Sequence, residues 1–396
     1  MRYLNTEQQR TNLIGTNMAA ATYKPLFNRR YLFWLMWAVA LVIVLLHATG
    51  RETPHTPAEI SWQPQPPHWH LFIANVEQHQ LQASLNLPPG WNLKGQQLRA
   101  ALQVGIEDWL LQPDIEQQLT DYGWQAQLLM DSTGLRLQLA LPHPPAHTQL
   151  DWLSQALPQL SDSLTPQQQQ RLMAEWRLDQ QQPEPRLLAE FASWLFPTPP
   201  ELPAWTLIYQ SDTVLPISAT SAILPDLHTS PLSHSHQREE RGYVNQPYQL
   251  LGWSVPLATS TDSLVTRRAA VIALQQILDG LPDTHEYRLI WNPLPPQSYL
   301  ALIVSGAADQ ELERQLRELI LDPASDRLFQ EAKTRLQAQD PQVREWLELT
   351  ARLQLATGNE TDYTAAFQQL TTDAIRQQLL ILMNPAHQLN LMLKPY

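Results

Sequence analysis

The sequence predicts an α+β protein made of two duplicated domains behind one N-terminal transmembrane helix. An uncharged apolar run, Tyr31–Leu46, comes close to the ~20 residues that span a bilayer. After it, strand-like and helix-like segments follow the same order twice, displaced by about 160 residues, as expected of a duplicated fold. A Pro-, Ser- and His-rich stretch, roughly 197–245, separates the copies and is too long for an ordinary connector.

The segment before the apolar run is basic, because it has a single acid, Glu7, against five basic residues: Arg2, Arg10, Lys24, Arg29 and Arg30. The positive-inside bias then keeps the N-terminus in the cytoplasm. We therefore expect a single-pass protein of the bacterial inner membrane whose main body lies in the periplasm. The alternative is a signal peptide cleaved after Gly50, since Ala48 and Gly50 are small residues of the kind that signal peptidase reads.

In the first copy, alternating apolar residues predict a strand at 81–87 and a hairpin of 125–130 and 135–141, whose turn residues are 131–134. Prolines and helical periodicity predict the helices. These are 98–111, a helix between Pro113 and Gly123, 150–160, 166–180 and 186–196.

The second copy repeats this order. Its predicted strands are 248–256, 287–292, 299–306 and 388–393, and its predicted helices are 263–278, 309–321, 324–339, 342–356 and 372–382. Each copy is expected to be a sheet with its helices packed on one face. The two sheets either face one another across a chamber or pack through their helices, and the sequence leaves both arrangements open.

These patterns divide the chain into six predicted parts. They are a cytoplasmic leader 1–30, a transmembrane signal-anchor 31–50, a linker 51–67, a first domain 68–203, an inter-domain linker 204–245 and a second domain 246–396.

Composition excludes several functions. The chain has no Cys, which excludes disulfides and thiolate metal sites. The whole chain has a net charge of −12, and because the leader is basic, the exported body is more acidic still. This argues against nucleic acid and anionic lipid headgroups as its partners. There is no G-x-S-x-G motif and no Gly-rich phosphate loop.

Two phrases carry a family resemblance: YGWQAQLLMDSTGLRLQLAL and the closing FQQLTTDAIRQQLLILMNPAHQLNLMLKP. Together with the element order, and with the helix 324–339, they resemble the pitrilysin/insulinase-type zinc peptidases over 69–396. That family includes the mitochondrial processing peptidase and the non-catalytic core subunits of the cytochrome bc complex. The resemblance implies duplicated α+β domains that pair into a clamshell around an extended peptide.

Active members of that family carry H-x-x-E-H on the first long helix of the first domain, where two His bind zinc and the Glu activates water. Here that helix reads LRAALQVGIEDWLLQ and contains no His. Glu107 and Asp108 are adjacent and so point to different sides of the helix, which favours an exposed edge. The family's substrate-holding Arg and Tyr would fall near Tyr287 and Arg288, but the order here is reversed and unspaced, so the role is not transferred.

The remaining histidines give weak metal candidates. His143 and His147 have helical spacing, but the intervening prolines prevent a helix. His68 and His70 would share one side of a strand and are better explained as surface residues. His234, His236 and Glu239 in the long insertion form the best remaining candidate. We assign no catalytic, cofactor-binding or metal-binding residue, and no cofactor.

The chain has 14 Trp, which core packing would mostly explain. An exposed fraction would suit a protein-protein surface, because Trp is frequent among interface anchors. The Trp residues that recur in the first half are Trp109, Trp124, Trp152, Trp176 and Trp194.

The function expected from these observations is a membrane-anchored, periplasm-facing, non-catalytic peptidase-like protein. It would bind a peptide or an unfolded protein, or act as the partner subunit of an active paralogous zinc peptidase, or as a homodimer. Two alternatives remain: an active zinc-dependent endopeptidase with relocated metal ligands, and a structural subunit of an envelope complex.

Overall fold

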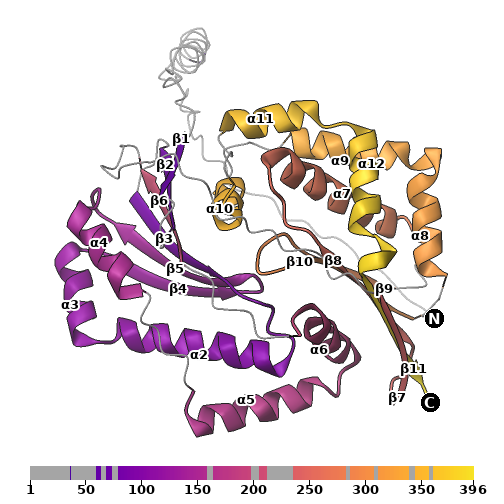
Figure 1. Ribbon diagram of the computed structural model, residues 1–396, viewed down its shortest axis with the longest axis horizontal. Helices are drawn as coiled ribbons and strands as arrows, with labels where there is room; N and C mark the ends of the chain where they lie inside the picture. The colour runs from indigo at the N-terminus through magenta and orange to yellow at the C-terminus, as the bar shows by residue number, and fades with distance from the viewer. Residues whose placement is uncertain are drawn as a thin grey trace, which may run out of the picture. The chain divides into compact units, whose positions relative to one another are not determined.

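The computed structural model divides into two units, Met1–His55 and Thr56–Tyr396 (Figure 1). It describes Met36 and residues 59–63, 68–73, 79–157, 164–197, 205–211, 235–281, 286–306, 311–338, 344–355 and 360–396. The predicted leader and signal-anchor, 1–50, lie outside the described residues apart from Met36. Within the described ranges, every helix is too short or too polar to cross a bilayer.

The first sheet has the strand order β1-β2-β6-β3-β5-β4. Its strands are β1 (Glu59–Gln63), β2 (His68–Ile73), β3 (His79–Asn86), β4 (Gln125–Asp131), β5 (Gly134–Leu141) and β6 (Thr206–Ser211). The predicted strand and hairpin are found as β3, β4 and β5. The linker prediction is wrong for Glu59–Gln63, because this segment pairs antiparallel with β2.

The second sheet has the order β7-β11-β8-β10-β9. Its strands are β7 (His236–Gly242), β8 (Tyr248–Val255), β9 (Glu286–Asn292), β10 (Ser298–Ser305) and β11 (Gln388–Pro395). The segment 204–245, predicted as an inter-domain linker or insertion, contributes a strand to each sheet. Thr206–Ser211 pairs with β2 and β3, while His236–Gly242 pairs with β11.

The two sheets share one pairing scheme. The series β2-β6-β3-β5-β4 matches β7-β11-β8-β10-β9 strand by strand. The first pair of each series is parallel and the other pairs are antiparallel. The repeat predicted from element order is therefore present in the topology, and the chain is α+β.

The helices follow the strands in both halves. Those of the first half are α2 (Leu93–Leu110), α3 (Pro113–Tyr122), α4 (His147–Ala156), α5 (Pro166–Asp179) and α6 (Pro183–Leu195). Those of the second half are α7 (Thr261–Asp279), α8 (Leu312–Leu321), α9 (Asp326–Gln337), α10 (Arg344–Leu353), α11 (Glu360–Gln369) and α12 (Thr372–Leu382), with single 3-10 turns at Pro323–Ser325 and Pro385–His387.

The long helices α2 and α7 begin in the same way. Asn92 caps α2 by accepting a hydrogen bond from the Gly95 amide, and Ser260 caps α7 by accepting one from the Ser263 amide. Arg99 in α2 donates to the carbonyl of Pro88, and Arg267 in α7 donates to the carbonyl of Pro256, each eleven residues back. This shared contact fixes the loop between strand and helix in both halves.

The helices are not confined to one face of their own sheet, so this part of the prediction is wrong. One face of the first sheet packs on α2, α3 and α4, and one face of the second sheet packs on the second half's own helices. The other face of the second sheet receives α6, through Leu187, Phe191 and Leu195. Reciprocally, Leu347 and Ala351 of α10 pack on Ile208 of the first sheet. We call α6 and α10 the borrowed helices, because each packs on the sheet of the other half.

Candidate functional site

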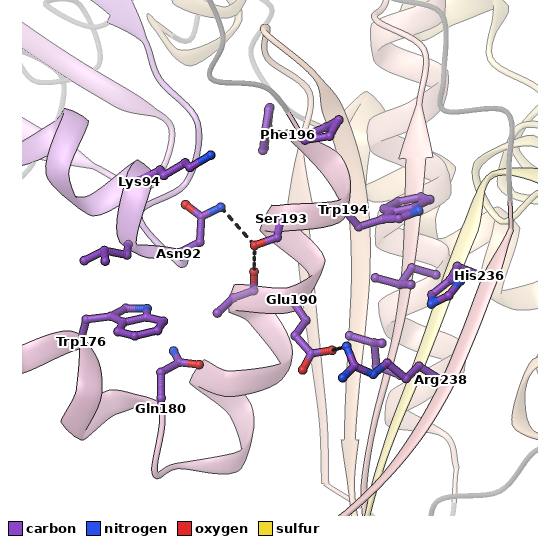
Figure 2. A pocket seen from close by; sticks show the side chains of 15 residues that line it. Asn92, Lys94, Trp176, Gln180, Glu190, Ser193, Trp194, Phe196, His236 and Arg238 are labelled. Atoms are coloured by element: carbon purple, nitrogen blue, oxygen red, sulfur yellow. Dashed lines mark hydrogen bonds and ion pairs between the residues drawn. The ribbon is translucent and has the colours of Figure 1, made fainter. Parts of the chain in front are cut away.

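A pocket with a volume of about 630 Å³ lies where the start of α2, the end of α5, α6 and strands β7 and β11 meet (Figure 2). It crosses the exposed side of α6, whose opposite side is buried on the second sheet. Its lining consists of Asn92, Leu93, Lys94, Trp176, Gln180, Ala189, Glu190, Ser193, Trp194, Phe196, Pro197, His236, Arg238, Leu389 and Leu391.

Residues at the helix ends position the walls of the pocket that are formed by α5 and by the start of α2. The Thr165 side chain caps α5 and Pro166 occupies its first turn, so the helix runs on to place Trp176 and Gln180 at its far end. Asn92 Nδ2 lies 3.5 Å from Ser193 Oγ and links the start of α2 to α6. Ser193 Oγ in turn donates to the carbonyl of Ala189 at 2.8 Å.

Aromatic packing holds α6 behind the pocket. The rings of Phe191 and Trp194 stack with centroids 5.9 Å apart, and Trp91, next to the cap of α2, meets Tyr299 of β10 edge-on at 5.3 Å. Phe191 is completely buried. The pocket therefore rests on a rigid aromatic layer that joins the two halves.

An ion network closes the side of the pocket formed by β7. Arg238 Nη1 donates to Glu190 Oε2 at 3.3 Å, and Glu240 accepts from both Arg238 and Arg186. Burial and the nearby charge of Glu240 raise the pKa of Glu190 above its ordinary value, against the opposing effect of Arg238, Arg186 and His236. The two carboxylates and two guanidiniums largely neutralise each other.

The other side of the pocket is rich in donors. Trp176 Nε1 and Gln180 Nε2 are buried and have no hydrogen-bond partner among the described residues. The exposed Lys94 forms no ion pair with a described residue, and the first turn of α2 contains no acid. Figure 2 shows Lys94, Trp176 and Gln180 on the side away from His236 and Arg238.

The helix that the resemblance matches to a metal-binding helix is α2, and its acids do not form a site among the described residues. Glu107 and Asp108 are both exposed, as expected, and Glu107 accepts a hydrogen bond from Gln103 Nε2 at 2.9 Å. The buried side of α2 is apolar, with Leu102, Ile106 and Trp109 in the core of the first sheet.

The histidine candidates do not converge. His143 is exposed, and His147 lies at the start of α4, where its Nδ1 is 2.7 Å from Asp151 Oδ2. His68 and His70 lie two residues apart in the sequence of β2. The described residues contain no group of three His, Asp or Glu side chains that could hold a metal.

The candidate in the insertion is separated by strand geometry. His234 lies outside the described residues, whereas His236 and Glu239 both belong to β7. Three residues apart on a strand, they point to opposite faces. His236 lines the pocket, while Glu239 pairs with Lys394 Nζ at 2.9 Å. These two side chains therefore do not share a metal ion.

Tyr287 and Arg288 also lie on opposite faces of a strand, β9. Tyr287 packs against the core on the helix side, where burial raises its pKa. Arg288 Nη1 donates to Glu184 Oε2 in the first turn of α6 at 3.0 Å. Arg288 thus anchors the helix that the second sheet receives.

The prediction that most Trp are core residues is correct for Trp109 and Trp124, which are buried. Trp176 and Trp194 instead line the pocket. The sequence argument missed Asn92, Lys94 and Gln180 as pocket residues. Only the N-cap preference of Asn92 was a visible signal, and it predicts a helix start rather than a site.

No protein-family model and no curated protein matches the sequence. Solved structures do match the fold. The chain is similar to the peptidase M16 inactive domain from Pseudomonas fluorescens, with TM-score 0.55 and 11% identity over 85% of this chain and 98% of that one. It is also similar to a protease from Helicobacter pylori, with TM-score 0.52 and 12% identity over 85% and 100% of the two chains.

A third match is an M16-like peptidase from Alicyclobacillus acidocaldarius, with TM-score 0.50 and 12% identity over 86% of this chain and 99% of that one. M16 is the class of pitrilysin/insulinase-type enzymes that the sequence resembles. At these identities the matches show the fold alone. The chain therefore has an M16-like peptidase fold.

Proposed function

We propose that this chain is a non-catalytic, peptidase-like binding protein that holds a peptide or an unfolded segment of a partner protein. The observation that carries the proposal is the composition of α2. In active enzymes of this fold class the first long helix supplies two imidazoles and a carboxylate. Here Leu93–Leu110 has no His, and its buried side is apolar.

The edge strand β4 supports peptide binding, although nothing in α2 supports hydrolysis. The strand β4 ends the first sheet and pairs only with β5 among the described strands. Its first three residues, Gln125–Gln127, are exposed. An exposed edge strand can bind an extended peptide through main-chain hydrogen bonds. The partner we favour is an active paralogous zinc peptidase, with a second copy of this chain as the other option.

The test uses the full-length chain in non-ionic detergent. We expect reversible binding of an unfolded polypeptide, measured by fluorescence anisotropy, and no cleavage of that polypeptide with or without chelator. Zinc is measured on the same sample by elemental analysis. Near-stoichiometric zinc together with chelator-sensitive cleavage would contradict the proposal and revive the active-peptidase alternative. If the chain raises the activity of a purified paralogous peptidase, the partner role gains direct support.

The proposed location is the inner membrane, with the body of the protein in the periplasm. A reporter enzyme that is active only outside the cytoplasm, fused after Tyr396, should be active. The fusion should also stay in the membrane fraction after carbonate washing. A soluble mature form that begins at Arg51 would show instead that the N-terminal segment is a cleaved signal peptide.

A further inference from the structure

The two sides of the pocket differ in whether their polar groups are paired, and this difference indicates a ligand. On the β7 side, Arg238 is paired with Glu190 and Glu240. On the α2/α5 side, Trp176 Nε1 and Gln180 Nε2 lack acceptors among the described residues. A buried donor left without an acceptor destabilises the fold. An acceptor group that enters this side, with modest side-chain adjustment, would remove that cost.

The charge on this side is positive. Lys94 lines the same side of the pocket without an ion pair to a described residue, and α2 begins with no acid in its first turn. The only carboxylate in the lining is Glu190, which is held by Arg238 on the other side. An anionic acceptor therefore gains from Lys94 and meets no nearby unpaired carboxylate in the described lining.

The rest of the lining is largely apolar. Trp194, Phe196 and Pro197 come from the end of α6, and Leu389 and Leu391 come from β11. A volume of about 630 Å³ is within the range of small-ligand pockets and exceeds what a lone small anion would fill. The surroundings thus favour a ligand that joins a large apolar side chain to its anionic group.

We propose that this pocket binds a peptide carboxylate that stands next to a large apolar side chain. This inference rests on the proposed peptide-binding function and names its ligand. The carboxylate lies against Lys94, Trp176 and Gln180, and the apolar side chain lies against Trp194 and Phe196. The carboxylate comes from a free C-terminus or from an Asp or Glu side chain, and the experiment separates these sources.

The probes are three fluorescein-labelled hexapeptides: Gly-Ser-Gly-Ala-Ala-Phe as the free acid, the same peptide as the amide, and Gly-Ser-Gly-Ala-Asp-Phe as the amide. Binding to the full-length chain in detergent is measured by fluorescence anisotropy. We expect the free acid to bind about tenfold more tightly than the first amide, as the loss of a charge-assisted hydrogen bond predicts. If the Asp-containing amide matches the acid, the pocket accepts either source; if it does not, the pocket requires a C-terminus.

Two pocket variants and one control sharpen the test. Lys94→Met should bring the acid-to-amide ratio close to one, and Trp176→Phe, which keeps a ring but removes the N–H, should lower affinity for the acid several-fold. Lys333→Met on α9 is the matched control, because Lys333 is outside the pocket, and it should leave the ratio unchanged. Equal thermal midpoints of the variants and the wild type would exclude misfolding.

The outcomes separate this inference from the proposed function. Equal binding of acid and amide, or an unchanged ratio in Lys94→Met, would overturn the carboxylate pocket. If no hexapeptide binds but an unfolded polypeptide does, the pocket assignment is wrong and the binding function stands. If the hexapeptides are cleaved in a chelator-sensitive way, the proposed function itself is wrong.

Discussion

The two sheets share one topology, but the faces that receive the borrowed helices α6 and α10 differ in polarity. The face of the second sheet under α6 is apolar, while the corresponding face of the first sheet, toward α10, is mostly polar. Under α6 lie Leu250, Gly252, Ala301, Ile303, Leu389 and Leu391. The first sheet carries Gln82, Ser84, Arg136, Gln138, Thr206 and Ile208 on the face opposite its helical core.

Different forces therefore hold the two borrowed helices. The contact of α6 is close packing around the fully buried Phe191. The contact of α10 combines the small apolar cluster of Leu347, Ala351 and Ile208 with a buried polar network. In that network Arg352 Nε donates to Asn86 Oδ1 at 2.8 Å and Arg352 Nη2 donates to the carbonyl of Thr133 at 3.1 Å. Glu348 of α10 also accepts from Arg136 at 3.1 Å.

This difference shows how one duplicated topology can serve two purposes. Burial of apolar surface stabilises in proportion to the buried area and does not depend on exact orientation, which suits α6 as the support of the pocket. A polar network contributes less net energy but is exacting in geometry, since each buried group must keep its partner. We infer that α10 fixes the register between the halves, and α6 fixes the pocket.

The largest expected effect tests the polar contact. Arg352→Met should lower the free energy of unfolding by about 3 kcal/mol, because it removes the donor to the buried Asn86 Oδ1 and one of the two guanidiniums that pair with Glu348. Burial lowers the pKa of Arg352 to about 10, against the opposing charge of Glu348, so the guanidinium still carries its charge at neutral pH. Urea unfolding followed by circular dichroism measures the change.

The matched control is Arg327→Met on α9. Arg327 pairs with Glu331 four residues on, and the two side chains are 85% and 45% exposed. An exposed helical pair of this kind contributes about 0.5 kcal/mol or less. Equal losses in the two variants would mean that the network with α10 adds nothing beyond a surface ion pair.

The next effect tests the apolar contact. A Cβ at Gly252 would lie 2.3 Å from Cε2 of Phe191, so Gly252→Ala should lower the free energy of unfolding by about 2 kcal/mol through overpacking. Adding Phe191→Leu should recover part of that loss, because the smaller side chain leaves room for the methyl group. The double-mutant cycle from urea titrations measures the coupling.

Gly280→Ala is the control for this pair. The nearest atoms to a Cβ there are 3.5 Å away, and Gly280 has φ −86°, so alanine fits without strain. Its effect should stay within about 0.5 kcal/mol. If Phe191→Leu gives no recovery in the Gly252→Ala background, α6 does not rest on this strand as closely as the geometry indicates.

Much of the fold could be predicted because its elements carry strong periodic signals. Strands β3, β4 and β5 and their counterparts β8, β9 and β10 were visible as short alternating or apolar runs between turn residues. The short Thr206–Ser211 was missed as a sheet strand because it lies inside a polar stretch. The exchange of α6 and α10 could not be predicted, since an apolar stripe such as Leu187, Phe191 and Leu195 shows that a helix is buried but not against which sheet.

The site was less predictable than the fold. His236 was singled out as a possible metal ligand, and it does line the pocket, but the period of two along β7 turns Glu239 to the other face. Trp176 and Trp194 were grouped with the core because the sequence around a single Trp does not show whether its side chain lies in the core or lines a pocket. Lys94 and Gln180 come to line one pocket only through the packing of α5 against α2.

The smallest expected effect asks whether the ion network beside the pocket resembles the one at α10. Burial, followed by the charge of Glu240, raises the pKa of Glu190. A carboxyl group whose folded pKa lies above its unfolded value stabilises the fold below the unfolded pKa, and this contribution is lost as the pH rises through the folded pKa. At pH 7 the charged Glu190 is therefore a mild cost that a neutral isostere would avoid.

Glu190→Gln should accordingly raise the free energy of unfolding at pH 7 by roughly 0.5 kcal/mol, after allowing for solvent screening of a partly exposed group. The gain should shrink towards zero as the pH falls and the wild-type carboxyl takes up a proton. Glu331→Gln, in an exposed pair on α9, is the control and should show no such gain at pH 7. If Glu190→Gln is less stable than the wild type at pH 7, the ion pair with Arg238 outweighs burial. The α6 side would then depend on polar contacts as α10 does, and the contrast between the two borrowed helices would fail.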